Sequence, residues 1–177
     1  MSTQKTVLKE EGTVGDNPVR LDQEKAEQVI DALNADLADA YTFYHQVQKH
    51  HWNVEGAEFR DLHVFLGEVS GAVEEAADAL AERAQALGGV PHASMAALSD
   101  AATVEPEDED VYDIRTSLHN DLDMLGDIIE SYRAHIDLAD GLGDHATAQM
   151  LRDQLVELED FAHEIEHYLE DDTLVRA

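Results

Sequence analysis

Cysteine, basic residues and long apolar runs are what this chain lacks. None of its 177 residues is cysteine, which excludes disulfides and thiolate metal sites. Only 11 lysines and arginines stand against 40 aspartates and glutamates. No stretch is apolar enough to span a bilayer, and the polar opening MSTQKTVLKEEGTVGDNPVR lacks the apolar core of a signal peptide. We therefore expect a soluble, cytoplasmic protein with no membrane partner.

The negative charge, -29 at pH 7, is spread along the whole chain rather than gathered in a tail. Such a surface repels nucleic acid and anionic membranes. It also weakens the compact state at moderate salt, whereas molar salt shortens the Debye length to about 3 Å and removes that penalty. The charge pattern therefore indicates a protein from a salt-rich cytoplasm.

Four long segments carry apolar residues at the spacing of a helix, and no segment alternates like a strand. They are expected at about residues 22–51, 58–87, 110–138 and 144–170. Between the second and third, a connection containing Pro91 and Pro106 is predicted to hold one short helix, around residues 95–98. Four amphipathic helices with one long connection fit an all-α, ferritin-like four-helix bundle.

This pattern divides the chain into an N-terminal tail over residues 1–21, the bundle over 22–170 and a C-terminal tail over 171–177. In the second helix, Phe59 and Leu62 begin the stripe that is expected to face the core. Gly88 and Gly89 are expected to end that helix, because glycine tolerates the left-handed conformation found there. The glycine-rich ADGLGD is expected to separate the last two helices.

Residues 163–167, HEIEH, match H-E-x-x-H, in which two helical histidines hold zinc and the intervening glutamate acts as a general base. At 100° per residue, His163 and His167 lie opposite the apolar stripe of their helix. A catalytic zinc needs three protein ligands, and the third histidine of the longer signature is missing after His167. A solvated or interface helix face is therefore favoured. The alternatives are an incidental surface metal site, and a zinc protease with Glu164 as its base.

A second set of histidines and carboxylates has more suitable spacing for a metal. His51 continues the heptad of inward-facing residues in the first helix, and His63 follows twelve residues later. The second helix also carries Asp78 and Glu82, four residues apart on one face. Imidazole and carboxylate ligands without thiolates suit iron, manganese or zinc. The alternative is a solvated polar face.

These residues cannot bind one metal within one chain. His63 and Asp78 are fifteen residues apart on one helix, or about 22 Å along its axis. If two copies of the helix pack antiparallel, the histidine end of one meets the carboxylate end of the other, which gives two identical sites per dimer. Gly67 and Gly71 lie on the same stripe and would let the helices approach closely.

The stretches HWNVEGAEFRDLH, residues 51–63, and DALAERAQALGG, residues 78–89, closely resemble the Dps family of mini-ferritins, which protect DNA in starved or oxidatively stressed cells. The resemblance implies a hollow homododecamer that binds Fe(II) at dimer interfaces. It also implies oxidation of that iron, preferably by hydrogen peroxide rather than oxygen, and storage of Fe(III) mineral inside the shell.

Residue by residue, the resemblance assigns His51 and His63 as iron ligands from one subunit, and Asp78 and Glu82 as ligands from its neighbour. Trp52 matches the aromatic residue beside the site, as an electron donor that limits radical escape. Because these residues bind and oxidise iron together, the chain is expected to be a ferroxidase.

One departure from the family concerns the second iron position, where Gly67 replaces an acidic ligand. Glu68, 100° further round the helix, and Glu55, close to His51 only in sequence, are the candidate replacements. A competing hypothesis is an iron-sequestering shell that has lost fast oxidation with this change. Glu74 and Glu75, within one turn of Asp78, are candidates to nucleate mineral, with a solvated acidic face as the alternative.

The other departure concerns DNA, which family members often bind through a lysine-rich terminal tail. The N-terminal tail here has only Lys5, Lys9 and Arg20, which are offset by nearby acidic residues and by the net charge. We therefore expect no direct DNA binding, with protection arising from removal of iron and peroxide.

The segment around Asp144 corresponds to the family's three-fold channel for iron. Ala146 and Gln149 stand where acidic residues are expected, which leaves His145 or Asp153 to line that channel.

Overall fold

Five helices form the secondary structure of residues 6–170, the part of the chain that the computed structural model describes. In chain order they are α1 (Gln23–Asn53), α2 (Phe59–Ala86), α3 (Met95–Ala101), α4 (Ile114–Leu142) and α5 (His145–Leu169). They confirm the all-α fold and the short helix in the long connection. The predicted C-terminal tail, 171–177, and Lys5 lie outside the described residues.

Side-chain caps begin α1 and α5 where the sequence predicted. Asp22 accepts a hydrogen bond from the backbone N of Glu24 (3.1 Å), and Asp144 accepts one from the backbone N of Thr147 (3.1 Å). These bonds satisfy backbone donors that the first turn of a helix leaves free.

The predicted bounds of α4, 110–138, were wrong at both ends. Its N-cap is Asp113, whose carboxylate accepts hydrogen bonds from the backbone N (3.1 Å) and Oγ1 (2.7 Å) of Thr116. At the other end the helix runs through Gly141 to Leu142, and only Gly143, with φ 85°, takes the left-handed conformation that stops it.

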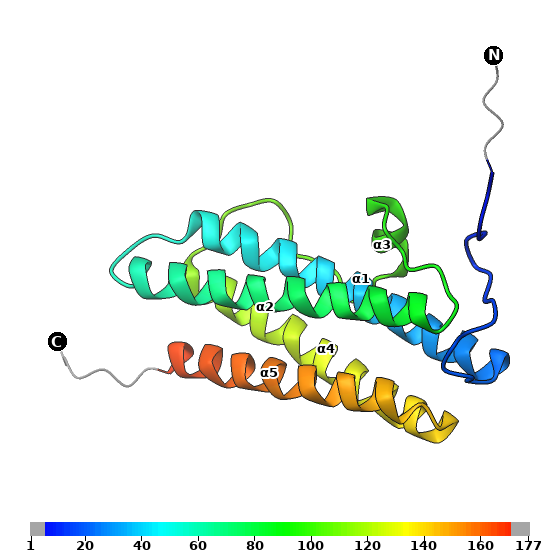
Figure 1. Cartoon of the computed structure of the whole chain (residues 1–177). Helices are drawn as coiled ribbons and strands as arrows, with labels where there is room; N and C mark the ends of the chain where they lie inside the picture. Colours follow the sequence, from blue (N-terminus) through cyan, green and yellow to red (C-terminus); the bar gives the residue numbers. More distant parts are fainter. Residues whose placement is uncertain (1–5, 171–177) are drawn as a thin grey trace, which may run out of the picture.

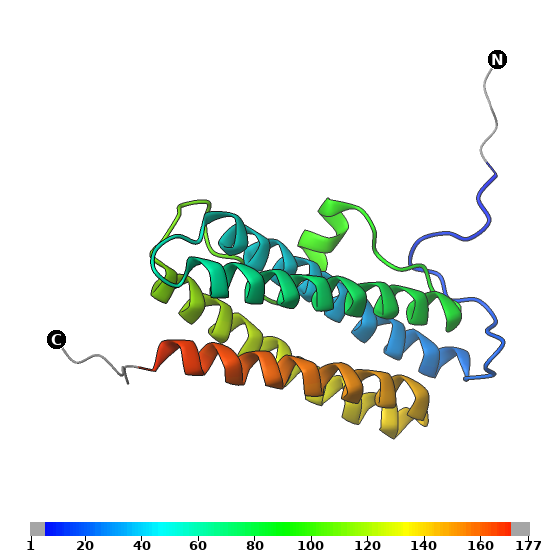
Figure 2. The ribbon, with the colours of Figure 1, turned by 60° about the vertical axis from the view of Figure 1, so that its left-hand side comes forward.

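The four long helices form a bundle in which α1 and α2 lie above α4 and α5 (Figure 1). α1 contacts α2, α3 and α4, and α4 also packs along α5. Figure 2 shows that α3 lies outside the bundle, on the side of α1 and α2, and that the long connection returns the chain to the far end before α4 begins. No helix within residues 6–170 has the length and apolarity needed to cross a membrane.

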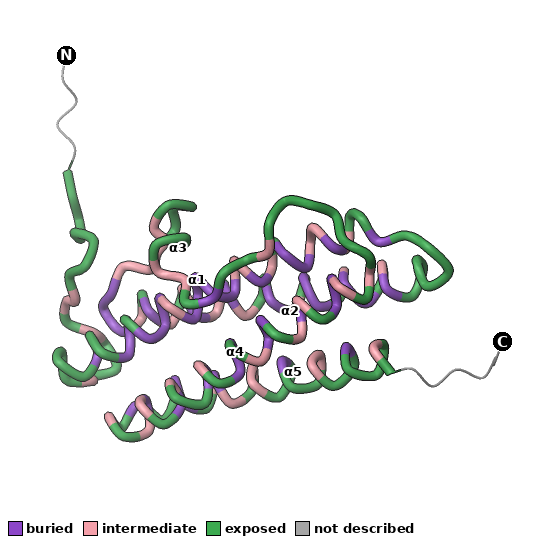
Figure 3. Tube along the Cα trace, turned by 180° about the vertical axis from the view of Figure 1, so that it is seen from behind, coloured by how far each residue is buried: buried purple, intermediate pink, exposed green. Residues whose placement is uncertain are grey.

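One side of each long helix is buried and the other exposed, so purple and green alternate along the trace in Figure 3. The largest fully buried side chains come from all four long helices: Leu33, Leu37 and Phe43, Leu66 and Leu80, Leu125 and Tyr132, and Leu151 and Ile165. Phe59 departs from the predicted inward stripe and is 47% exposed. It lies instead against the ring of His63, with the centroids 5.1 Å apart.

The segment before α1 is attached to the C-terminal end of α2. Gly15 donates its backbone N–H to the carbonyl oxygen of Gly88 (3.0 Å), and Lys9 Nζ donates to the carbonyls of Gly88 (2.9 Å) and Gly89 (3.1 Å). A cation there favourably opposes the negative end of the helix dipole. Gly88 has φ 99°, and a Cβ at this position would lie 2.4 Å from the carbonyl oxygen of Gly15. Glycine is therefore required for the contact.

Candidate metal centre

His51, in the last turn of α1, and His63, in the second turn of α2, lie face to face. Their rings are stacked, with centroids 3.8 Å apart and planes inclined by 17°. Nδ1 of His51 donates to the carbonyl oxygen of His63 (2.7 Å), and Nδ1 of His63 donates to the carbonyl oxygen of His51 (2.9 Å). Since a carbonyl oxygen only accepts, the neutral imidazoles carry their protons on Nδ1. Both Nε2 atoms are therefore left with a lone pair for a metal ion.

Gly67 makes room for this arrangement, one turn after His63 on α2. A Cβ built on Gly67 would lie 3.2 Å from Cε1 and 3.4 Å from Nδ1 of His51. A side chain at this position would press on the imidazole ring. The absence of an acidic residue here therefore has a local cause, because glycine accommodates the His51 ring where it now lies.

Asp78 and Glu82 lie exposed further along α2. The fifteen residues between His63 and Asp78 now fall within one continuous helix, so the two lie about 22 Å apart along its axis. Within residues 6–170, no group of three or more histidine, aspartate or glutamate side chains lies close enough to hold a metal ion. A single chain thus carries the two predicted parts of the site at separate places.

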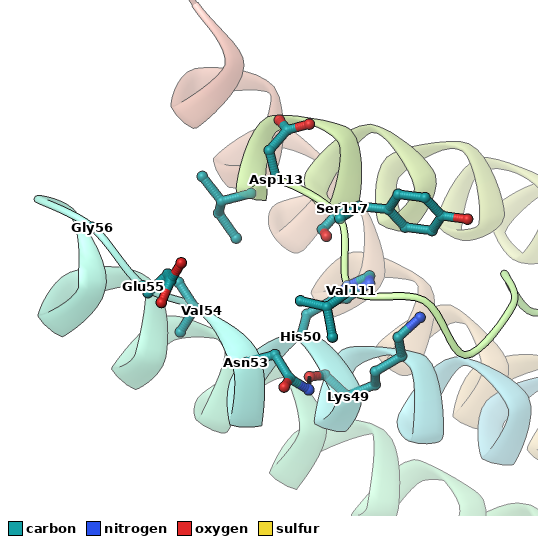
Figure 4. A pocket seen from close by; sticks show the side chains of 11 residues that line it. Lys49, His50, Asn53, Val54, Glu55, Gly56, Val111, Asp113 and Ser117 are labelled. Carbon is teal, nitrogen blue, oxygen red and sulfur yellow. Dashed lines mark hydrogen bonds between the residues drawn. The ribbon is translucent and has the colours of Figure 1, made fainter.

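Neither candidate replacement ligand joins the histidine pair. Burial raises the pKa of Tyr168 on α5, and the charges of Asp61, Glu164 and Glu68 raise it further. Glu68 itself is exposed on α2 and makes no cluster with the two histidines within residues 6–170. Glu55, in the turn between α1 and α2, lines a cavity of about 490 Å³ bordered by α1 and the start of α4 (Figure 4).

The remaining predicted residues are exposed. Trp52 follows His51 directly, with 69% of its surface accessible. Glu74 and Glu75 lie exposed one turn before Asp78. Their exposure leaves them accessible to iron or to a second copy of the chain.

At the start of α5, the capping residue Asp144 is buried, whereas His145 and Asp153 are exposed. Asp144 is only 6% exposed and accepts a hydrogen bond from Nη2 of Arg83 (2.7 Å). His145 and Asp153 are the exposed members, and they contact Asp140 and Gln149 respectively. Asp144 is thus a structural residue, whereas His145 and Asp153 stay available to line a channel.

The sequence prediction missed a buried network around His50. His50 is 4% exposed, while His51, which was expected at the core position, is only half-buried. Nδ1 of His50 bonds Oδ2 of Asp121 on α4 (2.7 Å), and Nε2 bonds Oε1 of Glu107 in the long connection (2.6 Å). Lys49 Nζ also bonds that Glu107 oxygen (2.7 Å). These bonds attach the long connection between α2 and α4 to α1 at His50, the residue before His51.

Both nitrogens of His50 face carboxylates, and this arrangement favours the imidazolium form of the ring. Burial lowers the pKa of His50, but the hydrogen bonds and charges of Asp121 and Glu107 outweigh it and raise the pKa above its usual value. Burial raises the pKa of Glu107, but hydrogen bonds with Lys49, Asn120 and His50 lower it overall. A second pair that the sequence did not reveal joins His135 Nδ1 to Oδ1 of buried Asp36 (2.8 Å).

Known proteins resemble this chain along most of its length. A model of the ferritin-like domain matches residues 30–175. The chain is 66% identical to the DNA protection during starvation protein of Halobacterium salinarum, over 99% of this chain and 97% of that protein. It is 37% identical to a nutrient stress-induced DNA-binding protein of Nostoc, over 98% and 95%. The chain belongs to the Dps family of ferritin-like proteins.

Solved structures of Dps proteins share the fold of this chain. An archaeal Dps homologue from Halobacterium salinarum superimposes with a TM-score of 0.94 at 65% identity, over 99% of this chain and 98% of that one. A Dps protein from Vibrio cholerae gives a TM-score of 0.83 at 28% identity, over 89% and 99%. The latter is described as a member of a superfamily of ferritin-like diiron-carboxylate proteins.

Proposed function

We propose that this protein is a ferroxidase that binds Fe(II) as its substrate, oxidises it at sites shared by two subunits and stores Fe(III) mineral inside a hollow homododecamer. The observation that carries the proposal is the reciprocal pair of hydrogen bonds between His51 and His63. Each bond fixes one imidazole through Nδ1 and leaves Nε2 free, which is how metal-binding histidines are commonly oriented.

The shared site follows from the length of α2. Two copies of α2 packed antiparallel would bring His51 and His63 of one subunit next to Asp78 and Glu82 of the partner subunit, and the two-fold axis would repeat the site. Gly71 supports this close approach, because a Cβ at that position would meet nothing within 4 Å in the isolated chain. Imidazole and carboxylate ligands suit iron, and the carboxylates favour the Fe(III) product.

The proposed reaction balances with peroxide as the oxidant. Two Fe(II) ions each give one electron to one hydrogen peroxide molecule, and its O–O bond breaks. The oxygen atoms, together with water, enter ferric oxyhydroxide, and protons are released. Exposed Trp52, adjacent to His51, would supply an electron where only one iron ion is bound. Glu74 and Glu75 would offer carboxylates on which the mineral begins.

The surface charge supports iron uptake and opposes DNA binding. The carboxylates behind the net charge of -29 attract cations and repel DNA phosphates at contact distance, which is within the Debye length of about 3 Å in molar salt. Lys9, one of the few cations of the N-terminal segment, already donates to the carbonyls of Gly88 and Gly89. We therefore propose that DNA is protected indirectly, by removal of Fe(II) and peroxide. The same charge favours a salt-rich cytoplasm as the place of action.

A second candidate function is an iron-sequestering shell without fast oxidation. It is favoured by Gly67, which provides no ligand for a second iron ion, and by the lack of a third histidine or carboxylate beside the histidine pair within residues 6–170. Both functions require the assembled shell and the histidine pair. They differ only in the rate at which bound Fe(II) is oxidised.

Stopped-flow absorbance of Fe(II) mixed with peroxide tests the proposal. We expect the protein to accelerate oxidation over buffer, and Asp78→Ala and Glu82→Ala to lower the rate. Glu157→Ala, which removes an exposed carboxylate of α5, is the matched control and should retain the wild-type rate. Equal rates in all variants would refute the assigned site. Binding of Fe(II) without acceleration would favour the sequestering shell.

A further inference from the structure

A second pair of histidines, on α5, has no role in the proposed iron site. His163 and His167 lie one turn apart on the exposed side of the helix. Their Nε2 atoms are 3.1 Å apart, and the ring centroids are 4.2 Å apart with planes inclined by 62°. This is a hydrogen bond, in which one Nε2–H donates to the lone pair of the other, so the two nitrogens point toward each other rather than into solvent separately.

The separation of the two nitrogens matches that of a chelated metal ion. Imidazole nitrogen binds metals such as zinc at about 2.0–2.1 Å. At that bond length, two neighbouring nitrogens are about 2.9 Å apart around a square-planar or octahedral ion and about 3.4 Å apart around a tetrahedral one. The measured 3.1 Å lies between these values. A metal ion would therefore replace the shared proton of this hydrogen bond, with only small rotations of the rings.

The surroundings of the pair favour binding through Nε2. Oε2 of Glu166 lies 3.9 Å from Nδ1 of His163, and a carboxylate on that side of the ring favours a proton on Nδ1. The backbone beneath the pair is also fixed. Phe65 of α2 contacts the rings of Phe161 and Tyr168, with centroids 6.4 Å and 5.4 Å away.

We propose that His163 and His167 bind one divalent transition-metal ion per chain through both Nε2 atoms, with water completing its coordination. Two imidazoles without a carboxylate favour Cu(II), Ni(II) and Zn(II) over Fe(II). The site is distinct from a protease centre, since it has two protein ligands rather than three. Glu164, the base that H-E-x-x-H would require, lies close enough to Tyr168 to raise the pKa of that phenol.

Isothermal titration of the assembled full-length protein with Ni(II) tests this site. We expect His163→Ala and His167→Ala each to bind one Ni(II) fewer per chain than the wild type. His119→Ala is the matched control: its side chain is exposed on α4, and no histidine lies one turn away on its helix. It should keep the wild-type stoichiometry.

The proposal is overturned if either His163→Ala or His167→Ala retains the wild-type number of Ni(II) ions. The same result is expected if neighbouring subunits of the shell bury His163 and His167, and it refutes the site in that case as well. Far-UV circular dichroism shows whether the variants remain folded. Their peroxide-dependent oxidation of Fe(II) should equal that of the wild type. That comparison separates a loss at α5 from damage at the proposed iron site.

Discussion

Replacing His50 with alanine removes one of the residues that join α1 to α4 and to the long connection. Asp121 is fully buried and has two hydrogen-bond partners among the described residues, Gln46 on Oδ1 (3.0 Å) and His50 on Oδ2 (2.7 Å). In His50→Ala the charge of Asp121 loses its cation and stays buried. Removal of one partner of a buried ion pair costs about 3–5 kcal/mol, mainly because the remaining charge is uncompensated.

A chain of this size loses about 2–4 °C in unfolding temperature per kcal/mol. His50→Ala should therefore lower the melting temperature by roughly 6–20 °C, as the product of these two ranges. Differential scanning calorimetry at fixed protein concentration and salt measures the shift. His119→Ala, which removes an exposed histidine of α4, is the control and should change stability by less than about 0.5 kcal/mol.

The stabilities contributed by His50 and Asp121 should also be coupled. The double variant His50→Ala/Asp121→Ala should lose less stability than the sum of the two single variants, because it leaves no carboxylate at position 121. A melting temperature of His50→Ala within about 2 °C of the wild type would refute the account, as that shift corresponds to less than about 1 kcal/mol. Strict additivity in the double variant would also contradict it.

His50, Gly88 and Gly67 each make a further prediction testable. The folded-state pKa of His50 lies above its usual 6.5. The stability that His50 gives the folded protein is therefore complete below pH 6.5 and is lost as the pH rises through the folded-state pKa. Denaturant titrations over this pH range should show the decline in the wild type and a weaker decline in His50→Ala. Gly88→Ala places a Cβ 2.4 Å from the carbonyl oxygen of Gly15, so limited proteolysis should cleave residues 6–20 faster than in the wild type; unchanged cleavage would mean that the contact is dispensable. Gly67→Ala should displace the His51 ring and slow peroxide-dependent Fe(II) oxidation, whereas Gly126→Ala, with open space around its Cβ, should not.

Local patterns were sufficient for most of the fold. Apolar residues at helical spacing marked the helices, and Asp22 and Asp144 marked two of their beginnings. The C-terminal bound of α4 was missed because Gly141 and Gly143 look alike in sequence, although only Gly143 takes a left-handed conformation. Phe59 was misplaced because periodicity assigns it to the core stripe, whereas its ring stacks on His63.

Some residues of the candidate site were also predictable from local sequence, and others were not. His51 and His63 were identifiable because twelve residues and a short turn separate them. His50 was missed because its partners Glu107 and Asp121 lie 57 and 71 positions away. A usable signal did exist: Asp121 lies three residues after Leu118 and four before Leu125 on the inward stripe. A carboxylate on a core face requires a buried partner.

The central claim is that two chains together form each iron site. An anomalous-scattering map of crystals soaked with Fe(II) tests it most directly. The account predicts an iron peak at ligand distance from Nε2 of His51 and His63 and from the carboxylates of Asp78 and Glu82 of the partner subunit. Iron peaks bound by one chain alone, or an empty space between the histidine pair and the partner subunit, would contradict it.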